Sequence, residues 1–145
     1  MTTLPDGLSA RILVVDDQQT NVRLIEYMLR RAGYEAVTST LDPRCVVALH
    51  LQNRYDLIIL DLQMPRMNGF EVMTALKEVD AGSVAILVMS ADPSQMLPAM
   101  EGGAASFLSK PFVLAEVLLR VQAMLETVAS LELVAHRVRG AAAHG

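Results

Sequence analysis

Five polar side chains in this sequence share one kind of position, because each follows a short apolar run typical of a buried strand. They are Asp16, Asp17, Asp61, Ser90 and Lys110. In open α/β sheets the groups that bind ligands lie beyond the carboxyl ends of the strands, so we expect these side chains to meet at one edge. A helix cap or a turn explains any one of them. Five together indicate a site.

The chemistry of such an edge follows from its residue types. Carboxylates held close together repel one another, and a raised pKa or a bound cation relieves that repulsion. Because the nearby ligands are hard oxygens without His or Cys, they favour Mg²⁺ over zinc. The ammonium of Lys110 and the hydroxyl of Ser90 are donors suited to phosphoryl oxygens. One carboxylate is then expected to act as the nucleophile that becomes phosphorylated.

The elements that would position these residues alternate along the chain. Residues 57–60 are all apolar with no helical or alternating period, which predicts a strand buried on both faces that ends at Asp61. Further strands are predicted at 11–15, 35–38, 84–89 and 106–108. Helical patterns fill the intervals between them, although Pro98 leaves room for only a short helix in the fourth interval. This order predicts an α/β fold with a doubly wound, five-stranded parallel sheet and right-handed crossovers.

Composition limits the class of protein. The 145 residues are 52% hydrophobic, enough for the core of one domain. A net charge of −4 and a pI near 5.3 argue against a nucleic-acid surface. No apolar run approaches the roughly 18 residues of a membrane span, and residues 1–10 lack the features of a signal peptide, so we expect a cytoplasmic protein. The single cysteine, Cys45, is expected to be a small buried hydrophobe.

Four motifs give the sequence a family resemblance. They are VVDD at 14–17, LDLQMPRMNG at 60–69, MSA at 89–91 and SKPF at 109–112. In this order, each after its expected strand, they resemble the receiver domain of two-component response regulators, from Arg11 to about Leu125. The resemblance implies strand order 2-1-3-4-5 and a phosphoacceptor signalling domain rather than an enzyme.

The resemblance also implies roles for individual residues. Asp61 would be the phosphoacceptor. Asp17 and Asp61 would ligate Mg²⁺ together with the main-chain carbonyl of Gln63, while Asp16 would act mainly through bound water. The phosphoryl donor would be a sensor histidine kinase or a histidine phosphotransfer protein.

Three further residues would respond to the phosphoryl group according to the same resemblance. Lys110 would pair with one phosphoryl oxygen and Ser90 would donate a hydrogen bond to another. Phe107 matches the aromatic switch position, whose ring turns inward as the Ser90 loop closes; the alternative for Phe107 is a strand residue in the core. Phosphorylation would shift an equilibrium between inactive and active conformations that other proteins read by contact.

A heptad-like stripe marks the C-terminal part of the chain. Apolar residues recur at steps of three and four from Leu114 to Val138, which predicts one long helix over Val113 to Arg139. We therefore divide the chain into a flexible leader (1–10), a receiver domain (11–125), a projecting helix (126–139) and a disordered tail (140–145). A homodimer through a parallel coiled coil is the leading interpretation, and folding back or fraying are the alternatives.

Two other function classes fit these residues less well. An aspartate-nucleophile phosphatase would need D-x-D-x-T, whereas Asp16 and Asp17 are adjacent, and a flavodoxin-like cofactor carrier would not place two acids at its phosphate loop. Two alternatives remain open. The chain is the receiver part of a larger regulator with an output module beyond residue 145, or it is a pseudo-receiver scaffold that acts through its C-terminal helix.

Overall fold

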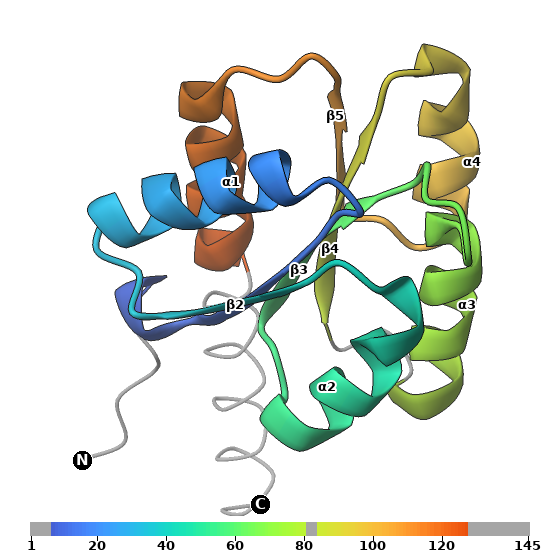
Figure 1. The fold of residues 1–145 in the computed structure, drawn as a ribbon, viewed down its shortest axis with the longest axis horizontal. Coiled ribbons are helices and arrows are strands. Elements are labelled where there is room, and N and C mark those ends of the chain that lie inside the picture. The colour runs from blue at the N-terminus through green and yellow to red at the C-terminus, as the bar shows by residue number, and fades with distance from the viewer. Residues whose placement is uncertain (1–6, 81–83, 128–145) are drawn as a thin grey trace, which may run out of the picture.

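The computed structural model describes residues 7–80 and 84–127, which form one parallel five-stranded sheet (Figure 1). The strand order is β2-β1-β3-β4-β5, and every neighbouring pair is parallel. The strands are β1 (Arg11–Val15), β2 (Ala36–Thr40), β3 (Leu57–Asp61), β4 (Ala85–Ser90) and β5 (Ser106–Ser109). This arrangement confirms the predicted fold class and strand order.

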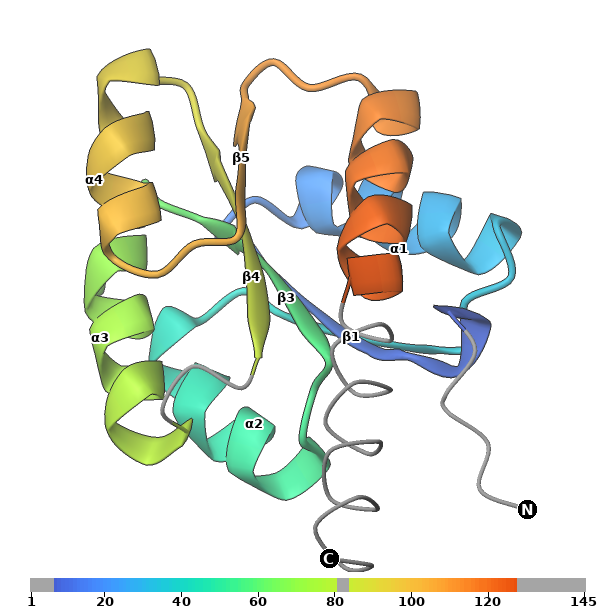
Figure 2. The same cartoon turned by 180° about the vertical axis from the view of Figure 1, so that it is seen from behind.

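Helices cover both faces of the sheet. They are α1 (Gln19–Arg31), α2 (Val46–Asn53), α3 (Gly69–Asp80), α4 (Met96–Glu101) and a last helix over 114–127. Short 3-10 turns are η1 (Gly7–Ser9), η2 (Pro43–Cys45) and η3 (Pro93–Gln95). The last helix packs beside α1 on one face, while α2, α3 and α4 cover the other (Figures 1 and 2). Within the described residues, no helix is long and apolar enough to cross a membrane.

The central strand β3 shows why its sequence has no period. All five of its residues are buried, since Leu57 and Ile59 enter the core beneath α1 while Ile58 and Leu60 enter the core beneath α2 and α3. A strand covered on both faces is apolar at every position. Its one carboxylate, at Asp61, is therefore placed where the strand leaves the core.

Several predicted strand bounds, those of β2 most of all, differ from the structure by one or two residues, and the predicted burial of Cys45 is wrong. β2 runs from Ala36 to Thr40 because Ser39 and Thr40 pair in register with Val14 and Val15 of β1. Ladder pairing with a buried neighbour overrides their polar composition. Cys45 is exposed rather than buried, because Val46, the next residue, is the one that faces the sheet.

The two ends of the described chain bear on the predicted domain boundaries. Ala10 is buried and Gly7–Ser9 forms a single 3-10 turn, so the last residues of the expected leader belong to the fold. Val117 and Val121 of the helix over 114–127 pack into the core beneath α1. The remainder of the predicted projecting helix and coiled coil, from residue 128 on, lies outside the described residues.

Candidate functional site

Three carboxylates meet at the carboxyl edge of the sheet. Asp16 and Asp17 follow β1 and Asp61 ends β3, and one carboxylate oxygen from each lies within 4.8 Å of the others. Because β1 and β3 are neighbours, with Val15 level with Leu60, their ends are adjacent. Asp16 and Asp61 are 0% and 2% exposed, whereas Asp17 is accessible to solvent.

A lysine from the edge strand reaches this acidic cluster. Lys110 follows β5, and its Nζ lies 3.1 Å from Asp61 Oδ2 and 3.3 Å from Asp16 Oδ2. Its backbone N–H donates to the carbonyl of Ser90 at 2.8 Å, which fixes the stem of the side chain beside β4. Lys110 pairs with two of the three clustered carboxylates, so one ammonium does not balance the charge that the three can carry. Hard oxygen ligands with excess negative charge suit a divalent cation such as Mg²⁺.

Asp16 is held by two donors that the sequence did not single out. The backbone N–H of Gln18 donates to its Oδ1 at 2.9 Å, and the side-chain amide of Asn21 donates to its Oδ2 at 3.2 Å. Both donors come from the start of α1, directly after the acidic pair. Asp16 is therefore oriented by its own local turn as well as by Lys110.

Asp61 is a buried acid, and the groups around it shift its pKa in opposite directions. Burial raises the pKa of Asp61 above its ordinary value, and the nearby charge of Asp16 raises it further. The backbone N–H of Gln63, 3.1 Å from Asp61 Oδ1, and the ammonium of Lys110 lower the pKa and only partly offset burial. The charged form of Asp61 is thus disfavoured in the cation-free fold.

This raised pKa predicts that Asp61→Asn stabilises the cation-free protein at neutral pH. Because the folded-state pKa lies above the unfolded one, the folded state binds the proton more tightly, and stability falls as pH rises through the window between them. Asparagine carries no charge, so the thermal midpoint of the Asp61→Asn protein should exceed that of the wild type by about 3 °C at pH 7 in EDTA. The advantage should vanish as pH falls to about 4. Scanning calorimetry across this pH range measures both.

Asp42→Asn is the matched control, because the pKa of Asp42 is shifted in the opposite direction to that of Asp61. Arg44 hydrogen bonds hold the pKa of the exposed Asp42 carboxyl at about 2. Its contribution to stability is present above the unfolded pKa and is lost as pH falls toward 2. Asp42→Asn should therefore bring no stabilisation at pH 7. A lower midpoint for Asp61→Asn than for wild type at pH 7 would contradict the burial argument.

Ser90 is the last residue of β4, which lies between β3, the strand that ends at Asp61, and β5, the strand that precedes Lys110. Met89 pairs with Asp61, and Ser90 pairs with Ser109 of β5. The Ser90 side chain is fully buried, and its Oγ accepts the N–H of Asp92 at 3.0 Å. Its hydroxyl also contacts Gln95, a residue that sequence reasoning did not single out. The hydroxyl is thus at the edge of the site but bonded within its own loop.

Phe107 lies in β5 opposite Val88, three residues before Lys110. Its side chain is half-buried and packs against the core beneath α2, α3 and α4. This position is compatible with both sequence interpretations, a core residue and a movable ring.

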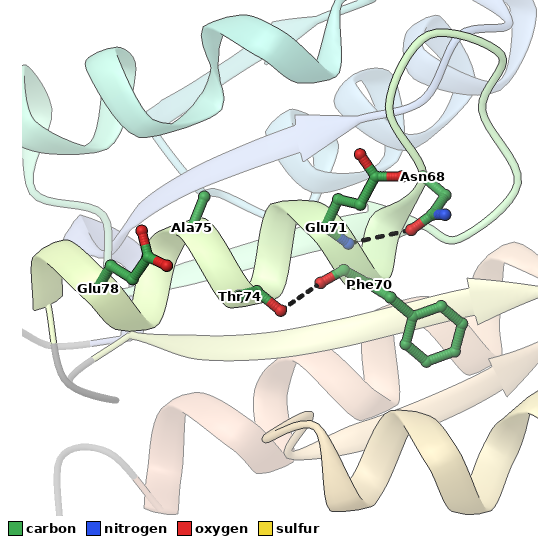
Figure 3. A pocket seen from close by; sticks show the side chains of 6 residues that line it. All are labelled: Asn68, Phe70, Glu71, Thr74, Ala75 and Glu78. Carbon is green, nitrogen blue, oxygen red and sulfur yellow. Dashed lines mark hydrogen bonds between the residues drawn. The ribbon is translucent and has the colours of Figure 1, made fainter.

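Among the hollows on the surface of the described residues, two bear on access to this edge. One of about 290 Å³ has Asp17 on its wall together with Leu41, Pro43, Pro65 and Arg66, so it opens onto the acidic cluster. The other, of about 360 Å³, lies along the outer side of α3 (Figure 3). Its lining residues are Asn68, Phe70, Glu71, Thr74, Ala75 and Glu78, none of which belongs to the acidic cluster. Of these two hollows, the one lined by Asp17 adjoins the acidic cluster.

The loop after Asp61 packs tightly against the start of α3. A Cβ placed on Gly69 would lie 2.8 Å from the carbonyl oxygen of Asp61 and 2.8 Å from Cα of Leu62. The N–H of Gly69 also donates to the carbonyl of Leu62 at 3.1 Å. Leu62 Cδ2 would also lie 2.7 Å from that Cβ, but because the other two crowded atoms are backbone, no side-chain adjustment relieves the contact.

Gly69→Ala is therefore expected to destabilise the fold by about 1–3 kcal/mol, since the backbone that carries Asp61 must shift. Gly102→Ala is the comparison, because a Cβ there would meet its nearest atoms at 3.2 Å or more. That variant should cost less than about 1 kcal/mol. Urea unfolding measures both, and equal midpoints for the two variants would refute the crowding at Gly69.

A doubly wound α/β sheet with clustered acids and a lysine at its carboxyl edge defines the flavodoxin-like receiver class. The chain belongs to the response regulator receiver domain family, whose model matches residues 12–122. Members are signalling domains rather than classical enzymes. The match confirms the resemblance drawn from the four motifs.

Individual relatives agree with this assignment. The chain is 40% identical over 119 residues to the transcriptional regulatory protein PrrA of Mycobacterium tuberculosis, covering 81% of this chain and 50% of PrrA. It is 33% identical over 115 residues to the response regulator ArlR of Staphylococcus saprophyticus, covering 79% and 52% of the two chains. The chain thus spans about half the length of these curated relatives.

Solved structures show the same fold. The chemotaxis protein CheY4 of Vibrio cholerae superposes with a TM-score of 0.73 at 30% identity, covering 80% of this chain and 98% of CheY4. The receiver domain of a Luxo repressor protein from Vibrio parahaemolyticus superposes with a TM-score of 0.80 at 22% identity, covering 88% and 98%. The second comparison supports the fold alone.

Proposed function

We propose that this chain accepts a phosphoryl group on Asp61 from the phosphohistidine of a sensor kinase or a histidine phosphotransfer protein. The observation that carries the proposal is the position of Asp61. It is a buried carboxylate 3.1 Å from the ammonium of Lys110 and clustered with two further acids at the open edge of the sheet. A structural ion pair alone would not gather two more carboxylates around Asp61.

The transfer step follows from these contacts. Asp61 Oδ1 is oriented by the N–H of Gln63, and Oδ2 faces Lys110, so Oδ2 is the oxygen that attacks phosphorus. The new O–P bond forms as the P–N bond of the phosphohistidine breaks, and the imidazole nitrogen keeps the electron pair. Lys110 stabilises negative charge on the transferring phosphoryl oxygens.

The donor set at this edge suits a magnesium ion. Asp17, Asp61 and the main-chain carbonyl of Gln63 would hold it directly, and Asp16 would hold it through water. When bound, Mg²⁺ supplies positive charge that offsets the charge of the acids and of the phosphoryl group. The three clustered carboxylates support this assignment, because Lys110 alone does not neutralise them.

Ser90 and Phe107 are the residues we propose as the switch. Ser90 would turn its hydroxyl to a phosphoryl oxygen, and Phe107 would move inward as the Ser90 loop closes. The resulting shift between inactive and active conformations would be read by partner proteins in the cytoplasm or through a homodimer formed by the C-terminal helix.

A second proposal is that the chain acts as the receiver part of a larger regulator. It covers about half of PrrA and of ArlR, and the first of these is named a transcriptional regulatory protein. Phosphorylation would then control an output module, and any DNA binding would belong to that module rather than to the acidic domain described here.

Magnesium removal tests the proposed chemistry. Incubation with acetyl phosphate and Mg²⁺ should add one phosphoryl group per chain, measured by intact mass, and EDTA should slow the uptake about a hundredfold because the metal stabilises the transferring charge. No uptake with or without Mg²⁺, under conditions that label a known receiver, would refute the proposal. It would instead support a pseudo-receiver that acts as a scaffold.

A further inference from the structure

The hydroxyl of Ser90 is engaged by its own loop in this structure. Its oxygen accepts the backbone N–H of Asp92 at 3.0 Å, and the hydroxyl donates to Oε1 of Gln95. A hydroxyl has a single proton to donate. While Gln95 accepts that proton, Ser90 has none left for a phosphoryl oxygen.

Gln95 is held in place by a well-defined turn. Asp92 caps η3, since its Oδ1 accepts from the backbone N–H of Ser94 at 3.0 Å and from the Ser94 hydroxyl at 2.7 Å. The backbone N–H of Gln95 donates to the carbonyl of Asp92 at 3.1 Å. α4 begins at the next residue, Met96. The contact between Ser90 and Gln95 thus joins the end of β4 to the start of α4.

We propose that Gln95 is a positioning residue that holds the Ser90 hydroxyl away from Asp61 until phosphorylation. This inference rests on the proposed function, which supplies the competing acceptor. A phosphoryl oxygen is charged and attracts the hydroxyl proton more strongly than a neutral amide does. The Ser90 hydroxyl therefore exchanges its bond to Gln95 for a bond to the phosphoryl oxygen. Loss of the bond to Gln95 opposes this exchange and sets how readily the active conformation forms.

Release of Ser90 also changes the surroundings of α4. Oε1 of Gln95 loses its donor immediately before the first residue of that helix. A signal at Asp61 is thereby transmitted to α4 through two side chains and one short turn.

Gln95→Met tests the proposal, because methionine has a similar length but no oxygen acceptor. Titration with beryllium fluoride and Mg²⁺, a phosphoryl mimic, is followed by the amide chemical shift of Ser90. Gln95→Met should bind the mimic about fivefold to tenfold more tightly than wild type, since no bond to Gln95 must be broken. Ser94→Ala is the matched control; it removes a hydroxyl from the same turn without touching Ser90, and its affinity should stay within about twofold of wild type.

The same substitution in a Ser90→Ala background separates positioning from general loosening of the loop. There Gln95→Met should change the affinity by less than about twofold, since the bond is already absent. The wild type, the two single variants Ser90→Ala and Gln95→Met, and the double variant form a double-mutant cycle. Their unfolding without any mimic should show a coupling between Ser90 and Gln95 of about fivefold in the equilibrium constant.

The outcomes distinguish this proposal from the proposed function. Additive unfolding effects, or tighter binding that persists in the Ser90→Ala background, would overturn the role of Gln95 alone. Failure of wild-type protein and of every variant to bind the mimic, with the unfolding coupling intact, would overturn the proposed function and with it the competition we describe.

Discussion

Asp61→Asn is expected to reduce phosphoryl uptake from stoichiometric to undetectable, the largest effect that the site predicts. An amide has the shape of the carboxylate but lacks its nucleophilic anionic oxygen, so no acyl phosphate forms. The fold should survive, because burial disfavours the charge that the substitution removes. Intact mass after incubation with acetyl phosphate and Mg²⁺ gives the result directly.

Asp42→Asn is the control for this experiment. Asp42 lies just beyond the end of β2, at the same edge of the sheet, but it pairs with Arg44 at 2.9 Å and is not one of the clustered acids. The same chemical change there should leave one phosphoryl group per chain. Full labelling of Asp61→Asn would assign the acceptor to another carboxylate and refute the mechanism proposed for Lys110.

The placement of the acids was predictable because it depends on topology rather than on side-chain detail. Apolar runs identify β1 and β3, parallel order brings their carboxyl ends together, and Asp16 and Asp61 follow from their positions in the runs. Lys110 was found the same way, after the weaker strand β5. The four motifs then indicated the receiver-domain family, whose model matches residues 12–122.

Contacts that depend on the packing of distant elements were not predictable in this way. Gln95 looks like an ordinary polar residue in a loop, and only the path of the 90–95 turn brings it to Ser90. His50 had no apparent partner in the sequence, because Asp80 is 30 positions away and meets it only when α2 and α3 pack together. Periodicity identifies elements but says little about which polar groups meet between them.

The surroundings of His50 form a buried polar cluster at the amino edge of the sheet, opposite the acidic site. His50 is 1% exposed, its Nδ1 accepts the backbone N–H of Tyr55 at 3.1 Å, and its Nε2 contacts Oδ2 of Asp80. The ring stacks on Tyr55 with centroids 6.1 Å apart. The Tyr55 hydroxyl in turn bonds Thr38 at 2.7 Å and Asn53 at 3.1 Å. One imidazole thus joins the ends of α2 and α3 to the start of β3.

His50→Ala is accordingly expected to lower the free energy of unfolding by about 3 kcal/mol. The substitution leaves a cavity where the ring was and removes the acceptor of the buried Tyr55 N–H, and both losses act in the same direction. Leu51→Ala, at the next position of α2 but 44% exposed, should cost less than about 1 kcal/mol. His50→Phe separates the two causes, because it refills the volume without restoring an acceptor and should recover less than half of the loss. Urea unfolding of the three variants decides the matter: a His50→Phe protein as stable as wild type would mean that packing alone, and not the hydrogen bonds to Tyr55 and Asp80, holds this edge together.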